Sequence, residues 1–255
     1  MCGRFTLKTP VAAIRRQLSL FSLPSSNPVL SRVRPRYNIA PNDKVLVIRC
    51  ADTEAGARKD QAIPAVELVE MHWGTVVSSP SHNNKTIINT RINTRINTRI
   101  ETLIENQQFR TTPLPRHCLI VADGYYEWKN TDGNKIPHYF YRTKGRLFLF
   151  AGMWECRGLA PQTLQDAVDS CTIITRPANK WTAQIHDRMP AILDMTTGFD
   201  WLVNSQALAE VQQSFKASPA DWLNMHTVHT RVNRVGFDHP SCVEPMDFHR
   251  QKPLF

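Results

Sequence analysis

A cysteine at the second position carries the most distinctive chemistry in this sequence. The chain begins Met-Cys-Gly-Arg-Phe, so removal of Met1 would leave Cys2 with an amine and a thiol on neighbouring carbons. These groups titrate at roughly pH 8 to 8.5, so both nucleophilic forms are accessible at neutral pH. The amine can condense with an aldehyde to an imine, and the thiolate can then close on the imine carbon to give a thiazolidine. The alternative is an ordinary second residue without chemical function.

A second candidate is the carboxylate of Glu127, in the segment ADGYYEW at 122–128. On a strand the side chains alternate between two faces, so Tyr125 and Glu127 share one of them. Aromatic neighbours should take the carboxylate partly out of water, which raises its pKa toward the range that suits acid catalysis. Glu127 could equally be an edge-strand residue that pairs with Lys129.

The third candidate is His186, in the segment WTAQIHDRMP at 181–190. We expect it at the end of a short helix, where an imidazole could shuttle protons near neutral pH. Histidines are common at helix ends, so a purely structural role is the alternative.

Short segments rich in β-branched and aromatic residues predict the strands that must position these groups. They are residues 45–50, 66–73, 117–128, 138–142, 147–155 and 171–175. Helices are expected at 10–18, 101–109, 178–185 and 206–215, and polar or small-residue loops at 23–28, 51–61, 78–85 and 130–134. No loop is long enough to suggest a domain boundary, so the pattern predicts an α+β protein with one domain over residues 1–255.

Three tandem copies of Ile-Asn-Thr-Arg run from Ile88 to Arg99 and continue into Ile-Glu-Thr. On a strand this repeat places every Asn and Arg on one face and every Thr and Ile on the other, and the same alternation adds Glu101 to the polar face. A helix is less suitable, because Asn, Thr and Ile are mediocre helix formers. The repeat therefore predicts a strand with amide, guanidinium and carboxylate groups along one ridge.

The composition predicts a soluble chain with an excess of positive charge. Lys and Arg number 31 against 22 Asp and Glu, and the resulting charge of +9 favours a polyanionic partner, although a solvated basic surface is the alternative. No run of about 18 apolar residues could span a bilayer, and the N-terminus lacks a secretory signal, so we expect a cytosolic protein. The six cysteines form no CxxC pair or zinc-type grouping, which predicts reduced thiols and no metal.

Several short blocks are spread along nearly the whole chain: MCGRF (1–5), RYNIAP (36–41), WG (73–74), INTRIET (96–102), ADGYYEWK (122–129), PHYF (137–140), FAGMWE (150–155), TRPAN (175–179), IHDRMPAIL (185–193) and TRVN (230–233). Together, these blocks resemble the SOS response associated peptidase family. The resemblance implies a single domain with a mostly antiparallel, barrel-like sheet and short peripheral helices. It also implies covalent capture of abasic sites in single-stranded DNA, which shields the lesion during the response to DNA damage.

The resemblance further implies roles for individual residues. The catalytic set would be Cys2 as the nucleophile, Asn97 to position the sugar, Glu127 as the acid or base that opens the sugar, and His186 to assist the imine step and its reversal. The DNA-binding set would be Arg4, Arg99 and Arg188 at phosphates, Trp73 and Trp128 as apolar walls beside displaced bases, and Thr175 as a backbone contact. The protein would act without cofactor or metal, as a monomer, and near the nucleoid if it is bacterial. Its enzymatic activities would be a cysteine peptidase activity that removes its own Met1 and a lyase-like activity on DNA. Ordinary methionine removal could replace the self-processing.

Two blocks depart from the family pattern. After Trp-Gly the family usually has a hydrophobic residue and then another tryptophan, whereas this sequence has Thr75 and no tryptophan, so one base-stacking wall is missing. Arg176 and Pro177 stand where small residues are usual, which weakens the expectation for Thr175.

The repeat is a third departure, because the family pattern needs only one copy. Only the third copy runs into Ile-Glu-Thr, so Asn97 and Arg99 are expected in the site. A slip of four residues keeps every side chain on its original face, however, so Asn93 or Asn89 could substitute.

Two other functions fit part of the sequence. Glutamine amidotransferase domains also begin Met-Cys-Gly, so an N-terminal-nucleophile amidohydrolase, in which Cys2 attacks an amide, is the main alternative. The sequence lacks the glycine-rich substrate loops of that family. A non-covalent single-strand binder is the third interpretation, which the presence of all four catalytic candidates disfavours.

Overall fold

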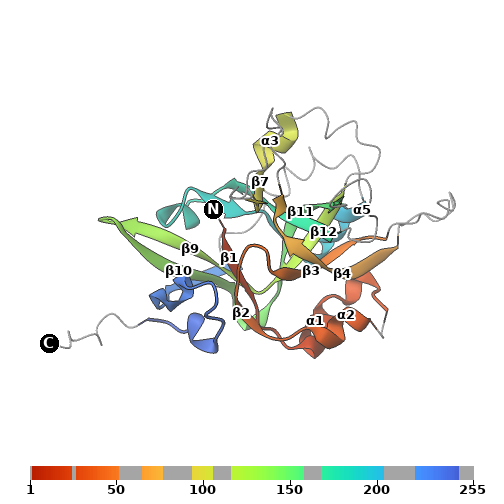
Figure 1. The fold of residues 1–255 in the computed structure, drawn as a ribbon, viewed down its shortest axis with the longest axis horizontal. Helices are drawn as coiled ribbons and strands as arrows, with labels where there is room; N and C mark the ends of the chain where they lie inside the picture. The colour runs from red at the N-terminus through yellow and green to blue at the C-terminus, as the bar shows by residue number, and fades with distance from the viewer. Residues whose placement is uncertain are drawn as a thin grey trace, which may run out of the picture.

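Two large β-sheets, a small two-stranded sheet and short helices at their margins make up the fold of the described residues (Figure 1). The structure is a computed structural model that describes residues 2–24, 27–51, 65–76, 94–105, 116–157, 168–203 and 222–246. The N-terminus lies between the two sheets, close to β1, β9 and the strands around β12.

The smaller sheet contains the N-terminal strand. Its order is β15 (Leu223–Thr227), β10 (Asn134–Arg142), β9 (Gly124–Thr131), β1 (Arg4–Leu7) and β2 (Arg36–Ile39). All of its pairings are antiparallel, and Arg4 lies opposite Tyr126 on β9. Residues that precede β1 therefore approach β9 beyond Tyr126, where Glu127 lies.

The larger sheet closes on itself. Its order is β13 (Arg188–Pro190), β12 (Val168–Pro177), β4 (Val66–Trp73), β3 (Lys44–Cys50), β8 (His117–Ala122), β11 (Phe148–Arg157) and β14 (Ile192–Leu193). A further pairing between β11 and β12 joins the central strands into a ring. Strand β7 (Asn97–Arg99) adds to β12 in parallel, while β5 (Thr75–Val76) and β6 (Thr94–Arg95) form a separate two-stranded sheet. The predicted α+β class and barrel-like core are confirmed.

The sequence of β8 is a nearly continuous apolar run instead of an alternation of apolar and polar residues. All six of its residues are buried, because the helix α5 (Met195–Val203) also packs against it. The indole Nε1 of Trp201 donates to the Cys118 carbonyl at 3.0 Å. A Cβ at Gly198 would lie 2.9 Å from Cδ1 of Leu149, so a larger residue here would require this buried side chain to shift.

The predicted strands are confirmed with one correction, at 117–128. This segment is two strands, β8 and β9, which belong to different sheets. Asp123 lies at the break, and its buried carboxylate accepts hydrogen bonds from the Thr6 hydroxyl at 2.5 Å and from the Lys8 and Thr9 amides at 2.7 Å each. Asp123 therefore ties the end of β1 to the junction between the sheets, which helps to fix the position of Cys2.

The helix predictions were less accurate. Helices α1 (Val11–Gln17) and α3 (Ile100–Glu105) confirm two of them in part, whereas residues 206–215 lie outside the described residues. A further helix, α2 (Pro28–Arg32), begins inside a predicted loop, capped by the Asn27 side chain. Single turns of 3-10 helix occur at 19–21, 143–145, 182–184, 230–233 and 240–242.

The helix predicted at 178–185 is wrong. Strand β12 extends to Pro177, and only the 3-10 turn Thr182–Gln184 follows. The Asn179 side chain accepts hydrogen bonds from the amides of Trp181 and Thr182, at 3.1 and 2.8 Å. Because this cap places the start of the turn at Thr182 and β13 begins at Arg188, too few residues remain between them for a longer helix.

The loop predictions fall partly outside the described residues. The loop predicted at 130–134 is shorter in the structure, because β9 extends to Thr131 and β10 begins at Asn134. The turn is residues 132–133, where Gly133 has a φ of 82°. Most of 51–61 and all of 78–85 lie outside the described residues, as do the first copy of the repeat and the Asn93 position of the second.

Candidate active site

The third copy of the repeat, residues 96–99, follows the predicted strand for only part of its length. It forms a strand through Arg99, as expected, but the chain enters α3 at Ile100. Glu101 is therefore a first-turn helix residue, and its prediction on the same strand face as Asn97 is wrong.

Cys2 lies at the meeting point of the two sheets. It is fully buried, and its Sγ lies 3.7 Å from the Arg4 carbonyl. Burial raises the pKa of the Cys2 thiol well above its usual range, and the negative charge of Glu127 adds to the effect. The resting sulfur is therefore a neutral thiol close to the Glu127 carboxylate.

Asn97 is directly connected to Cys2. The Asn97 Nδ2 donates to the Cys2 carbonyl at 2.9 Å. Its position is fixed by the residue before it, because the Ile96 carbonyl accepts hydrogen bonds from the Ile173 amide and the Trp73 indole, at 3.1 and 3.0 Å. The third copy of the repeat therefore supplies the asparagine beside Cys2 in this structure.

The amide oxygen of Asn97 is also notable. Its Oδ1 is buried and has no hydrogen-bond partner among the described residues. An acceptor of this kind, next to the backbone of Cys2, could receive a hydrogen bond from a hydroxyl or amine of a bound substrate.

Glu127 is buried on β9, opposite His138 on β10. Burial raises the pKa of Glu127 to about 7, and the nearby negative charge of Asp187 contributes in the same direction. The predicted upward shift is confirmed in its direction. By contrast, Lys129 is exposed, so Glu127 and Lys129 are not two exposed residues of a surface ion pair. A carboxyl that titrates near neutrality can donate and accept a proton in one reaction cycle.

His186 lies beside Asp187, whose negative charge contributes to the raised pKa of Glu127. Its Nδ1 is 3.0 Å from the Arg188 amide and 2.8 Å from an Asp187 carboxylate oxygen. Nδ1 can accept from the amide only when it carries no proton, and burial lowers the pKa of His186. We therefore assign a neutral imidazole with its proton on Nε2, because the Asp187 pair would require protonated Nδ1 and Asp187 is 84% exposed.

The predicted phosphate contact Arg188 is engaged inside the protein. Its guanidinium, which is 10% exposed, binds Glu101 through two hydrogen bonds of 2.7 and 3.0 Å and donates to the Thr175 carbonyl at 2.7 Å. This pairing ties β13, which follows His186, to α3, which follows Asn97. In this state Arg188 is a brace between catalytic segments rather than a free cation for DNA.

We predict that Glu101→Ala destabilises the protein by about 1–3 kcal/mol, because it leaves the Arg188 guanidinium buried without its carboxylate. The Arg188 hydrogen bonds lower the pKa of Glu101, so this stabilisation is present at neutral pH and is lost as pH falls through that lowered pKa. Urea unfolding at pH 7 would measure the effect. Glu105→Ala, at an exposed position on the same helix, is the matched control. Equal stability of both variants would contradict the brace.

Trp73 and Thr175, which were predicted to contact DNA, are not accessible for such contacts in this structure. Both side chains are fully buried. The Trp73 ring packs edge-on against Phe5, with centroids 5.0 Å apart, and the Thr175 hydroxyl lies 3.5 Å from the Thr98 carbonyl. Trp73 thus positions the repeat strand, and neither side chain presents surface to a base or a phosphate.

Trp128 and Arg99 remain candidates for DNA contact. The Trp128 ring is partly exposed, and its Nε1 donates to the Asn233 side chain at 2.8 Å. Arg99 is exposed next to Asn97, opposite Thr175 in the β7–β12 pairing. These two side chains can meet a ligand without rearrangement of the core.

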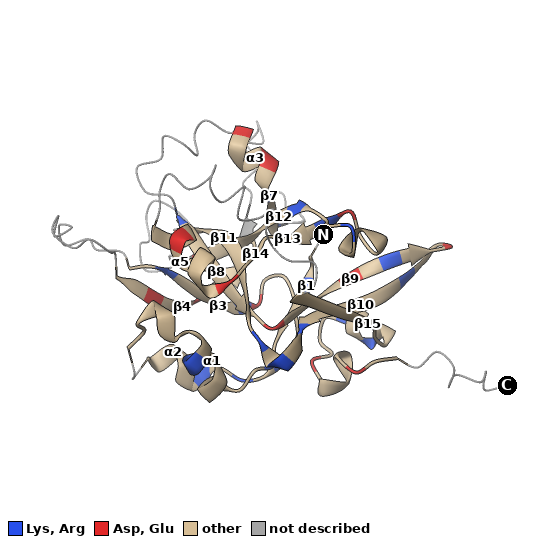
Figure 2. Ribbon diagram, turned by 180° about the vertical axis from the view of Figure 1, so that it is seen from behind, with Lys and Arg blue, Asp and Glu red and all other residues tan. Residues whose placement is uncertain are grey.

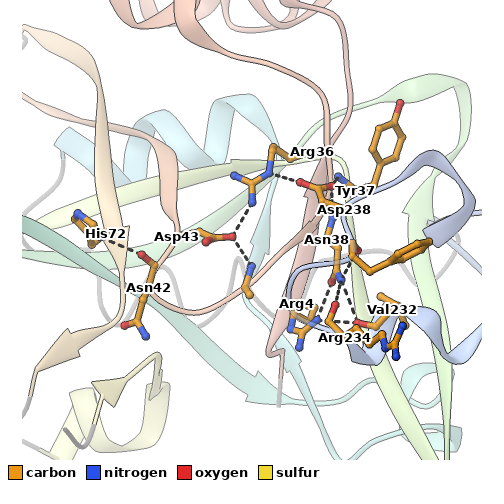
Figure 3. Close-up of polar contacts among 12 residues, drawn as sticks. Arg4, Arg36, Tyr37, Asn38, Asn42, Asp43, His72, Val232, Arg234 and Asp238 are labelled. Atoms are coloured by element: carbon orange, nitrogen blue, oxygen red, sulfur yellow. Dashed lines mark hydrogen bonds and ion pairs between the residues drawn. The ribbon is translucent and has the colours of Figure 1, made fainter.

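Arg4 belongs to a hydrogen-bond network that the sequence did not reveal (Figure 3). Its guanidinium donates to the Asn38 side chain at 2.9 Å and to the carbonyls of Val232 and Asn233 at 2.7 and 3.3 Å. Arg4 therefore attaches the TRVN segment to β1, and any phosphate contact would compete with these bonds.

The centre of this network is Asn38, a buried polar residue in β2. Its amide nitrogen lies 3.0 Å from the Arg234 carbonyl and 2.8 Å from the Phe237 carbonyl. Asp238 links the same C-terminal segment back to β2, since it pairs with the Arg36 guanidinium and accepts a hydrogen bond from the Tyr37 amide at 2.5 Å. The sequence RYNI of β2 gives no sign that Asn38 is buried, and it could not identify partners about 200 residues away.

Positive charge is spread over several elements rather than concentrated at the site. Figure 2 shows Lys and Arg on α1, on the β9–β10 hairpin and near β13 beside the N-terminus. In the parts of the chain that the structure describes, no three His, Cys, Asp or Glu side chains gather to hold a metal. Nor does any described helix have the length and apolar character needed to cross a membrane.

Comparisons with known proteins identify the family and the fold of the chain. The family model for SOS response associated peptidase (SRAP) matches residues 1–235. The abasic site processing protein YoqW of Bacillus subtilis is 31% identical over 249 residues, covering 96% of this chain and 99% of that protein. The abasic site processing proteins HMCES of Gallus gallus and YedK of Escherichia coli are each 26% identical, covering 97% and 83% of this chain and 78% and 85% of their own lengths. A crystal structure from Bacteroides thetaiotaomicron shares the fold, with a TM-score of 0.72 at 20% identity over 96% of this chain and 100% of that one.

Proposed function

Because this chain belongs to the SOS response associated peptidase family, we propose that it processes abasic sites in single-stranded DNA by capturing them covalently through Cys2. The observation that carries the proposal is the junction of Cys2, Asn97 and Glu127. A hydrogen bond of 2.9 Å fixes the Cys2 carbonyl to Asn97, and the buried carboxyl of Glu127 lies close enough to influence the thiol. Relatives named as abasic site processing proteins support the same substrate.

The first step requires a free amine at Cys2, hence loss of Met1. The amine adds to the C1′ aldehyde of the ring-opened deoxyribose and gives a carbinolamine. Protonated Glu127 then donates its proton to the departing hydroxyl, which leaves as water, and a protonated imine remains. A carboxyl with a pKa near 7 suits this step, because it holds a proton at neutral pH and releases it readily.

The second step closes the ring. The thiol proton of Cys2 passes to the Glu127 carboxylate, the sulfur bonds to C1′, and the electrons of the C=N bond return to nitrogen. The product is a neutral thiazolidine, one water has been released, and Glu127 has recovered its proton. Asn97 contributes by holding the Cys2 backbone so that amine and thiol reach the same carbon.

DNA recognition in this proposal relies on few base-specific groups. An abasic sugar offers no base edge, so phosphate contact and stacking must position it. Arg99 and Trp128 are the accessible residues for these contacts. Neutral His186, with the proton on Nε2, would assist the imine step and its reversal as a hydrogen-bond donor.

The direct test is incubation of the protein, with its free Cys2 terminus verified by mass spectrometry, with single-stranded DNA containing one abasic site. We expect an adduct that survives denaturing electrophoresis, and none with the matched intact strand. No adduct from verified protein would overturn the proposal. Release of ammonia from glutamine instead would support an amidohydrolase.

We predict that Asn97→Ala slows adduct formation roughly tenfold or more, because the Cys2 backbone loses its anchor. Deletion of two copies of the repeat, eight residues in all, should preserve the rate, since the remaining copy still runs into Ile-Glu-Thr. Rates from denaturing gels would test both variants. A normal rate for Asn97→Ala would show that another copy supplies the asparagine.

A further inference from the structure

The hydroxyl of Tyr125 is a buried polar group that the proposed capture chemistry leaves unused. Tyr125 is fully buried, and its Oη has no hydrogen-bond partner among the residues that the structure describes. A buried donor without a partner costs about 1–3 kcal/mol, so such a group calls for an explanation. Its neighbour Tyr126 shows the usual arrangement, because its Oη donates to the Tyr37 carbonyl at 2.6 Å.

Tyr125 lies in the same part of the core as Cys2 and Glu127. It lies two residues before Glu127 on β9, so the strand alternation places both side chains on the same face, whereas Tyr126 is on the other. Its ring stacks on Phe140 with centroids 4.8 Å apart, in the same core cluster as Cys2. Burial raises the pKa of Tyr125, and negative charge on Cys2 and on Glu127 raises it further. The phenol therefore keeps its proton and lies within electrostatic range of both groups.

Ring closure creates a need for such a donor. The nucleophile is the Cys2 thiolate, yet burial and the charge of Glu127 both raise the pKa of this thiol. The Arg4 carbonyl near Sγ is an acceptor, so it can receive the thiol proton in a hydrogen bond but cannot stabilise negative charge on sulfur. A neutral O–H group that has no other partner among the described residues can do so without bringing a competing charge into the core.

We propose that the Tyr125 hydroxyl donates a hydrogen bond to the Cys2 sulfur as it becomes a thiolate, and so accelerates closure of the thiazolidine ring. The inference rests on the proposed function. Tyr125 keeps its own proton throughout, the thiol proton passes to the Glu127 carboxylate, and the sulfur electron pair forms the bond to C1′. Imine formation, which uses the Cys2 amine and the Glu127 proton but not the thiol, does not depend on Tyr125.

The chain offers a matched pair of variants for the test. Tyr125→Phe and Tyr126→Phe each remove one hydroxyl from neighbouring residues on opposite faces of β9. The first readout needs no DNA: the rate of Cys2 alkylation by iodoacetamide across pH 6 to 10, followed on the N-terminal peptide by mass spectrometry. We expect Tyr125→Phe to react roughly tenfold more slowly at neutral pH, with its profile moved to higher pH, and Tyr126→Phe to match the unsubstituted protein.

The second readout separates the two chemical steps on abasic single-stranded DNA. Borohydride trapping reports the imine, and gel-stable adduct without reductant reports the closed ring. In Tyr125→Phe we expect imine formation at the unsubstituted rate and ring closure slowed roughly tenfold.

The outcomes distinguish this inference from the proposed function. If the unsubstituted protein forms no adduct, the proposed function fails, and the alkylation profiles still decide the role of Tyr125. An unshifted alkylation profile in Tyr125→Phe overturns the inference, even if the adduct forms normally. The variant keeps the ring that stacks on Phe140 and loses an unpaired polar atom, so its melting temperature should not fall. A lower melting temperature with an unshifted profile would indicate a structural role and also overturn the inference.

Discussion

Cys2→Ser is expected to reduce denaturant-stable crosslinking to abasic DNA below detection. A serine hydroxyl ionises far less readily than a thiol, so the second bond to C1′ does not form and only a hydrolysable imine remains. Denaturing electrophoresis with and without borohydride would distinguish the two species. Trapping with borohydride should still give an adduct, because the serine variant retains its terminal amine once Met1 is removed.

The matched control for this variant is Cys50→Ser. Cys50 is a partly buried free thiol on β3, whose Sγ lies 3.2 Å from the Leu202 carbonyl at the end of α5. Its replacement should leave crosslinking unchanged. A Cys2→Ser protein that crosslinks at the normal rate without reductant would show that the thiazolidine is not the product.

Glu127→Gln should slow adduct formation by roughly 10²- to 10⁴-fold, the usual contribution of a general acid or base. The amide has nearly the same shape but can neither give a proton to the departing hydroxyl nor take one from the thiol. Single-turnover gel assays would measure the rate. Glu70→Gln, which changes an exposed carboxylate on β4, is the control and should react normally.

The pH dependence of water loss from the carbinolamine should follow the titration of the Glu127 carboxyl. With the pKa of Glu127 at about 7, the acid form predominates below neutrality and falls about tenfold per pH unit well above it. Loss of water from the carbinolamine should follow that decline in the unsubstituted protein and not in Glu127→Gln. Identical profiles for the two proteins above pH 7 would assign the acid role to another group.

The raised pKa of Glu127 also has a consequence for stability. The unfolded carboxyl ionises first, so folding loses stability as pH rises from the ordinary glutamate range to about 7 and stays constant beyond it. Glu127→Gln removes this penalty, which a shift of this size limits to about 3 kcal/mol. The variant should therefore gain more stability at pH 8 than at pH 4. Greater stability together with lower activity is the pattern expected of a group that is buried for function.

The sequence alone determined what depends on neighbouring residues. The strands around residues 45–50 and 66–73 followed from β-branched residues and flanking turns, and the upward shift of the Glu127 pKa followed from its aromatic neighbours. The choice of the third repeat copy came from its continuation into Ile-Glu-Thr, and its Asn97 is the described asparagine that contacts Cys2. Each of these features is encoded within a few residues of the chain.

Tertiary structure decided which partners the polar side chains have. Arg188 resembled a phosphate-binding residue, but packing brings Glu101 to it from 87 residues away. Trp73 resembled a stacking wall, but closure of the ring of strands buries it and directs its indole to the repeat. The physical reason is that residue type specifies what a side chain can bind, whereas long-range strand pairing specifies what it meets. For the same reason, only the folded chain shows that the Tyr125 hydroxyl has no partner among the described residues and that Tyr125 shares a core cluster with Cys2.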